Sequence, residues 1–185
     1  MNLRPTLAGR IVTLEPLEER HVPELREASA DERAWTWMVT TDFDVWLGYT
    51  LGSDVFHPFA VVHDGRVVGS TSYLSVVPEH GRLEIGNTWN TPSMWGTGAN
   101  TEAKYLLLRH AFEELGMKRV EFKTDAKNER ARAALAAIPS EFEGIHRKHM
   151  IVRDGERRDS AWYAVIDDDW PEARAALERR IAQKA

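Results

Sequence analysis

The stretch that decides the fold is residues 84–103, which read EIGNTWNTPSMWGTGANTEA. It begins as a strand, passes through a turn and a loop with two glycines, and continues into a helix. Gly96 and Gly98 let the backbone curve without interference from Cβ atoms, and the helix start that follows directs unpaired N–H groups toward one point. Such a point attracts a phosphate, although two glycines can equally do no more than shape a strand-to-helix corner.

Two known phosphate-binding loops can be compared with this segment. The loop of nucleoside triphosphatases needs a Lys followed by Ser or Thr after its last glycine, where this chain has Ala99 and Asn100. A dinucleotide-binding loop wants a third small residue at Thr101 and an acid after the next strand, a place that Asp125 fills. A dinucleotide-binding loop normally follows the first strand of a parallel unit, whereas antiparallel strands are expected before the glycine loop of this chain. The triphosphatase interpretation fails, and a nucleotide-dependent oxidoreductase is the weakest alternative kept.

Residue patterns predict helices and a meander of strands in the first half of the chain. The pair Asp64-Gly65 between two strand-like runs is typical of a tight hairpin. The predicted elements, in order, are a strand at 10–17, a helix at 18–29, short helices with loops at 31–53, and strands at 59–62, 67–77 and 82–89.

The second half alternates strands and helices. Apolar residues at helical spacing, with Gly116 as the stop, predict a helix over 102–115. The remaining predicted elements are a strand at 120–124, a helix over 131–138 ended by Pro139, strands at 142–152 and 157–166 joined at Asp154-Gly155, and a helix from Asp169 through Ile181. The pattern therefore favours an α/β fold of mixed α+β character, in which helices flank a mixed sheet.

Composition excludes several classes of function. The 185 residues suit one domain, and the net charge of −5 (24 Lys and Arg against 29 Asp and Glu) argues against nucleic-acid binding by bulk charge. A local basic patch for one phosphate-bearing cofactor is still compatible with it. The absence of cysteine excludes disulfides, thiolate metal sites and a cysteine nucleophile. No apolar leader or run of about 20 apolar residues is found, so we expect a cytoplasmic protein that does not bind membranes.

The order and spacing of several motifs carry a family resemblance over nearly the whole chain. These motifs are 10–17 with His21 and Leu25, 84–86, 95–103, 119–122, 128–130, 143–144 with Arg147, and 159–163. Together they resemble the GCN5-related N-acetyltransferases (GNAT), in the branch of RimJ- and RimL-like proteins. The resemblance implies a central mixed, mostly antiparallel sheet flanked by helices, with a C-terminal helix, in a single N-acetyltransferase domain over 1–185.

The resemblance also implies a cofactor, acetyl-CoA, with CoA as the product. Its pyrophosphate would lie on the N–H groups of the loop residues Trp95, Gly96, Thr97, Gly98, Ala99 and Asn100. In this family the strand before the loop separates from its neighbour at a bulge, leaving backbone groups for the pantetheine arm and the thioester carbonyl. Trp89 and Asn90 occupy that place. Asn128 matches an asparagine that contacts the cofactor arm and is also a candidate helix N-cap; Arg130 is a candidate contact to the ribose phosphate or a solvent-facing charge.

The chain departs from the family pattern near the expected thiolate. A Leu-Gly-Phe of many relatives is replaced by Ile138-Pro139-Ser140, and a serine three residues after the asparagine is Ala131. Ser140 is the nearby hydroxyl that could act as the acid for the leaving thiolate, or it is a turn residue beside proline. These departures keep open a non-catalytic acyl-CoA-binding sensor on the same fold.

Acetylation of an amine needs an uncharged nucleophile, so a group must accept a proton from the ammonium directly or through water. Glu84 is the best candidate base, because it alternates with Leu83 and Ile85 and so faces the opposite side of the sheet. The alternative is an exposed strand glutamate paired with Arg82 or Arg119. Direct attack of the amine, without an acyl-enzyme, fits the absence of cysteine.

The acceptor and the assembly are less constrained. Trp35 and Trp37 either form a wall of the acceptor pocket or belong to the core. His146 and His149, three apart on a strand, are expected on opposite faces, so no metal site is predicted. The sequence thus predicts an acetyl-CoA-dependent N-acetyltransferase acting on a small-molecule amine or a protein N-terminus, with a homodimer left open because the last helix can pack on the sheet or on a second subunit.

Overall fold

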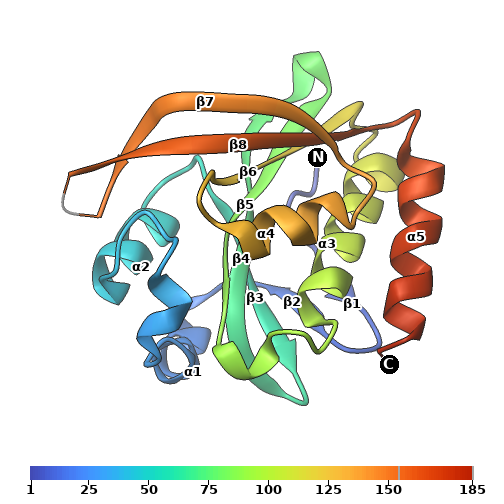
Figure 1. The fold of residues 1–185 in the computed structure, drawn as a ribbon. Coiled ribbons are helices and arrows are strands. Elements are labelled where there is room, and N and C mark those ends of the chain that lie inside the picture. Colours follow the sequence, from blue (N-terminus) through green and yellow to red (C-terminus); the bar gives the residue numbers. More distant parts are fainter. Residues whose placement is uncertain (154, 185) are drawn as a thin grey trace.

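The computed structural model describes residues 1–153 and 155–184, so Asp154 of the expected Asp154-Gly155 turn lies outside the described residues. One eight-stranded sheet has the order β1-β2-β3-β4-β5-β6-β8-β7 (Figure 1). The strands are β1 (Leu7–Ala8), β2 (Thr13–Pro16), β3 (His57–His63), β4 (Arg66–Val77), β5 (Arg82–Asn90), β6 (Arg119–Asp125), β7 (Glu141–Val152) and β8 (Glu156–Ile166). Among these strands β5 and β6 pair in parallel and the other neighbours are antiparallel, which confirms the mixed, mostly antiparallel sheet.

Helices cover both faces of this sheet (Figure 1). On one side lie α1 (Val22–Ala28) and α2 (Phe43–Leu51), and on the other lie α3 (Ala99–Arg109), α4 (Glu129–Ala136) and the expected C-terminal helix α5 (Trp170–Ala182). Each side has its own buried apolar cluster, one centred on the leucines of α3 and one on the tryptophans near α2. None of the helices in the described residues combines the length and apolarity needed to cross a membrane.

Turn chemistry confirms two of the expected boundaries. Asp64 and Gly65 both have positive φ, 48° and 73°, and join β3 to β4 as the tight hairpin turn that this residue pair favours. Gly116, at φ 68°, follows the π-helical turn His110–Glu114 that extends α3. The helix begins at Ala99, three residues before the predicted start, because Gly98 already serves as its N-cap.

The expected strand over 10–17 is wrong in its first half. Residues 7–8 and 13–16 instead form a small hairpin, β1 and β2, with the intervening backbone drawn toward α3. The carboxylate of Glu102, 2% exposed, accepts hydrogen bonds from the amides of Arg10, Ile11 and Val12 at 2.9, 2.6 and 2.7 Å. A buried carboxylate satisfied by three backbone donors fixes the chain start against the helix that follows the glycine loop.

We expect Glu102→Gln to lower the free energy of unfolding by about 2 to 3 kcal/mol, because the amide presents an N–H donor to backbone N–H groups that then lose their acceptor. Thermal and denaturant unfolding measure this loss. Glu79→Gln, at an exposed position outside the hairpin, is the control and should leave stability unchanged. Equal stability of the Glu102 variant and the wild type would contradict the proposed anchoring.

Candidate active site

The central feature of the site is the early end of the pairing between β5 and β6. Their parallel register covers Arg82↔Arg119, Leu83↔Val120 and Glu84↔Glu121 and then stops. Beyond it, both strands continue for several residues with no pairing between them. Backbone N–H and C=O groups of both strands therefore face a gap rather than each other, and buried groups of this kind require other partners.

A bulge in β5 shapes one side of this gap. Ser70 pairs with Trp89 while Ser72 pairs with Gly86, so β5 holds one residue more than β4 over this interval. The extra residue is Asn87, at φ 50°, and its side-chain oxygen accepts a hydrogen bond of 3.0 Å from Nε1 of Trp46 on α2. Asparagine tolerates this left-handed conformation better than most residues. The bulge expected from the family resemblance is therefore present.

The bulge also reverses which face the following side chains occupy. Leu83 and Ile85 pack on the α3 side, whereas Trp89 packs on the α2 side against Trp35 and Trp46, with ring centroids 5.1 and 5.4 Å away. Without the extra residue, Trp89 would share the face of Leu83 and Ile85. Trp35 is therefore a core residue rather than a pocket wall.

A cavity of about 900 Å³ occupies the gap between these central strands, and its lining includes residues from helices on both faces of the sheet. Of the residues predicted to bind cofactor or substrate, it is lined by Glu84, Trp89, Asn90, Trp95, Gly96, Gly98, Asn100, Asn128 and Arg130. The cavity is also lined by residues from the segments around α2, namely Trp37, Met38, Tyr49 and Phe56. Trp37 therefore lies in the pocket wall, which was one of the two interpretations of this residue.

The glycine loop contributes free backbone donors to the cavity. The amides of Trp95, Thr97 and Ala99 are used inside the loop, donating to Pro92, Met94 and the Thr97 hydroxyl. For Gly96 and Gly98, with φ of 79° and 99°, the described residues offer no such acceptor. The first turn of α3 adds amides that lack an intrahelical partner.

Three expected site residues do not line the cavity: Thr97, Ala99 and Ser140. The Thr97 hydroxyl donates to the Met94 carbonyl at 2.8 Å, and Ala99 is fully buried in the core. The Ser140 hydroxyl donates to the Leu135 carbonyl at 2.7 Å. This placement agrees with the second interpretation of Ser140, a turn residue beside proline, rather than with an acid for the leaving thiolate.

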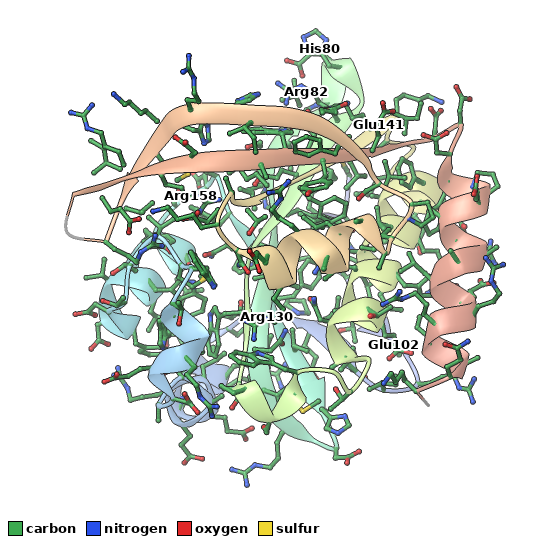
Figure 2. The ribbon with its side chains drawn as sticks, viewed as in Figure 1. His80, Arg82, Glu102, Arg130, Glu141 and Arg158 are labelled. Carbon is green, nitrogen blue, oxygen red and sulfur yellow. The ribbon has the colours of Figure 1, made fainter. Side chains whose placement is uncertain are left out.

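Asn128 and Arg130 border the cavity from α4. The Asn128 side chain accepts a hydrogen bond from the amide of Ala131 at 3.0 Å, so it caps the helix and lines the cavity at once. The Arg130 guanidinium lies 3.5 Å from the ring centroid of Trp95, a contact that joins the start of α4 to the loop before α3. Figure 2 shows Arg130 between α4 and this loop. Burial lowers the pKa of Arg130 from its usual value.

The cavity is strongly cationic although the chain carries a net negative charge. Its described lining holds a single carboxylate, that of Glu84, and the cationic residues Lys104, Lys123, Arg130, Arg158, Arg180 and Lys184. Lys104 donates to the Asn100 side-chain oxygen at 2.7 Å, and burial lowers the pKa of Lys104 to about 8. Such a cluster beside a helix N-terminus suits phosphate groups.

The carboxylate of Glu84 lies on β5 at the point where the strands separate, and the residue is 2% exposed. Lys123 on β6 donates to it at 2.8 Å. Burial raises the pKa of Glu84 above its usual value, and the ammonium of Lys123 opposes part of that rise. The alternative of an exposed glutamate paired with Arg82 or Arg119 is wrong.

Sequence reasoning missed Lys104, Lys123, Arg158, Arg180, Gln183 and Lys184, all of which line the cavity. Lys104 could have been predicted from the sequence, because it lies four residues after Asn100 on the same helix face. Arg158, Arg180 and Lys184 come from segments far along the chain, and no local pattern shows that the fold brings them to the cavity.

The histidine pair on β7 corrects another expectation. The register of β7 against β8 shifts between His146 and Met150, and Lys148 takes a φ of 51°. As a result His146 and His149 lie on the same face, with ring centroids 5.8 Å apart, and both contact Trp162. Strand alternation fails here because the strand is irregular.

Comparison with known proteins gives this geometry a context. The acetyltransferase (GNAT) domain family matches residues 12–138. The chain belongs to this family. Membership of this family removes the nucleotide-dependent oxidoreductase as an interpretation of the chain.

Individual relatives extend the match. The chain is 30% identical over 110 residues to YdaF of Bacillus subtilis (strain 168), named as a ribosomal N-acetyltransferase; these residues span 60% of the chain and 59% of that relative. A GCN5-related N-acetyltransferase structure from Brucella melitensis has 34% identity, covers 96% of this chain and 86% of its own, and superimposes with a TM-score of 0.90. RimJ of Mycobacterium smegmatis, solved with CoA-disulfide, has 26% identity, 98% and 92% coverage, and a TM-score of 0.78.

Proposed function

We propose that this protein transfers an acetyl group from acetyl-CoA to a primary amine. The observation that carries the proposal is the separation of β5 from β6 beyond Glu84, because it opens one cavity that holds both phosphate-binding groups and a buried carboxylate. The name of YdaF and the CoA-disulfide bound to RimJ agree with this chemistry.

The residues present fit the diphosphate and the arm of CoA. The amides of Gly96 and Gly98 and the cationic side chains of Lys104, Arg130 and Lys184 supply the donors and charges that phosphates need. The amide-containing pantetheine arm would pair with the unpaired backbone of β5 and β6. Supporting this, the pairing between β5 and β6 ends at Glu84 while both strands continue beyond it.

When bound, acetyl-CoA supplies an activated acyl group. The task of Glu84 is then to hold the acceptor amine and to take its proton, directly or through a water molecule. Burial gives this carboxylate a pKa above that of an exposed glutamate, which makes it a stronger base, and Lys123 keeps it in the ionised form that can accept a proton. With no cysteine in the chain, the amine attacks directly. Ser140 is left out of this mechanism because its hydroxyl bonds to Leu135.

Two measurements test the proposal as a whole. Calorimetry compares the binding of acetyl-CoA, CoA and NAD, and an assay of thiol release then follows acetyl transfer to amines and N-terminal peptides. We expect binding of acetyl-CoA and CoA, no binding of NAD, and acceptor-dependent release of CoA. Binding of CoA without thiol release from any acceptor would instead support the acyl-CoA sensor.

Gly96→Ala should weaken CoA binding by about tenfold or more, equivalent to ~1.4 kcal/mol, because its Cβ would project where the backbone must approach phosphate. A Cβ at Gly96 meets nothing within 4 Å, so the substitution adds backbone strain at φ 79° but no clash. Gly116→Ala is the matched control, since Gly116 also has positive φ and open space but lies outside the cavity. Calorimetric affinities that fall equally in both variants would contradict this placement of the phosphates.

Binding of CoA should take up protons at pH 8 to 10, because adjacent phosphates favour the ammonium of Lys104 and raise its pKa from about 8 toward or above the ordinary value near 10. Affinity should therefore decline as pH rises through this window. Calorimetry at pH 9 in two buffers of different ionisation enthalpy counts the protons. Lys104→Met should abolish the uptake, whereas Lys118→Met, at an exposed ion pair with Asp167, should retain it.

Glu84→Gln should lower kcat by about 10²- to 10⁴-fold while CoA affinity is unchanged. In the wild type, kcat/KM should rise with pH through an apparent pKa above 4.5, since the raised pKa of Glu84 must be exceeded before the carboxylate is ionised, and the variant should lose that limb. Glu121→Gln is the control, because Glu121 is its register partner on β6 but does not line the cavity. Equal activity of the two variants would remove Glu84 as the base.

A further inference from the structure

The part of the cavity around Glu84 holds more positive than negative charge. Glu84 and Lys123 form an ion pair of 2.8 Å and balance each other. Among the described lining residues, the other charged side chain that comes from a strand is that of Arg158, on β8, whereas the rest come from α3, α4 and the C-terminal segment. A second positive group attached to the acceptor amine would therefore be repelled here, and a negative one attracted.

Arg158 is 6% exposed, and Figure 2 shows it beneath the β7–β8 hairpin on the side where α2 lies. Its Nε has no hydrogen-bond partner within the described residues. The carboxylates whose charge acts on it are those of Asp125 and Glu84, and both are already engaged, by Arg153 at 3.2 Å and by Lys123. Burial lowers the pKa of Arg158, which agrees with a charge that the fold does not compensate.

A buried guanidinium without a matched carboxylate is costly, and packing alone would be served better by an apolar side chain. This cost is explained if the side chain serves a ligand, because Arg158 borders the cavity and its buried guanidinium has no carboxylate partner of its own among the described residues. A planar guanidinium binds a carboxylate through two parallel hydrogen bonds, a geometry that lysine cannot supply.

We propose that the acceptor is an amine that also carries a carboxylate, and that Arg158 binds this carboxylate while Glu84 faces the amine. The inference rests on the proposed acetyl transfer and adds the chemical class of the acceptor. Two sources supply such a group: the α-carboxylate of a free amino acid, and an acidic side chain next to the N-terminal amine of a peptide.

The test measures binding of acetylated product probes to the protein loaded with CoA, so that no turnover is needed. One pair of probes is N-acetylalanine and N-acetylalaninamide; the other is acetyl-Ser-Asp-amide and acetyl-Ser-Asn-amide. We expect the carboxylate member of at least one pair to bind about tenfold or more tightly than its amide partner. The pair that shows the difference identifies the source of the carboxylate.

Arg158→Met should abolish that difference, and Arg158→Lys should retain part of it. Arg157→Met is the matched control, because this neighbouring arginine of β8 is exposed and should leave the preference intact. The Met variant should also have a melting temperature no lower than the wild type, since an uncompensated buried charge is removed; a merely structural arginine would give a clear decrease.

Three results would overturn the inference. They are equal affinities within both probe pairs, no binding of either carboxylate probe to the CoA-loaded protein, and a preference for the carboxylate that survives in Arg158→Met. If Arg158→Met does not fold, the wild-type comparison of acid with amide and the Arg158→Lys variant decide the question. Failure of the wild type to bind CoA is a different result, because it contradicts the proposed acetyl transfer itself.

Discussion

The parallel pairing of β5 with β6 ends after Glu84, and the rest of the site depends on that ending. Two central strands that stay paired hydrogen-bond their backbone groups to each other and leave no room for a ligand between them. Here, instead, the separated strands present unpaired groups to a cavity, and each must be supported from outside the sheet. Asn87 and α2 support β5, and the Trp95–Arg130 contact joins the loop beyond it to α4.

The lining of this cavity carries an excess of positive charge. The chain is acidic overall, yet the described lining carries one carboxylate among several cations. Burial lowers the pKa of Lys104 to about 8, and phosphates near α3 would stabilise its ammonium, so a bound anion would relieve an unfavourable arrangement of the free protein. The same reasoning applies on the other side of the gap at Arg158. On the proposed function, both places give up stability for a group that a bound ligand completes.

Local patterns predicted the elements well and the site only in part. The Asp64-Gly65 turn and the stop at Gly116 are decided by neighbouring residues, and both were correct. The first half of the strand over 10–17 failed because a carboxylate 90 residues away, that of Glu102, captures its amides. The same limit explains Arg158 and Lys184, since only the assembled sheet and the last helix bring them to the cavity.

The β7–β8 hairpin shows how the fold holds a costly charge in place. Arg153, at φ 36° in the turn between these strands, donates from its amide to the Val39 carbonyl at 2.9 Å and from its guanidinium to the Met38 carbonyl at 2.8 Å. It also pairs with Asp125 at 3.2 Å. These bonds tie the hairpin to a segment that borders the cavity. They also occupy the carboxylate best placed to neutralise Arg158, so the contact that closes this side of the pocket is the one that leaves its guanidinium available to a substrate.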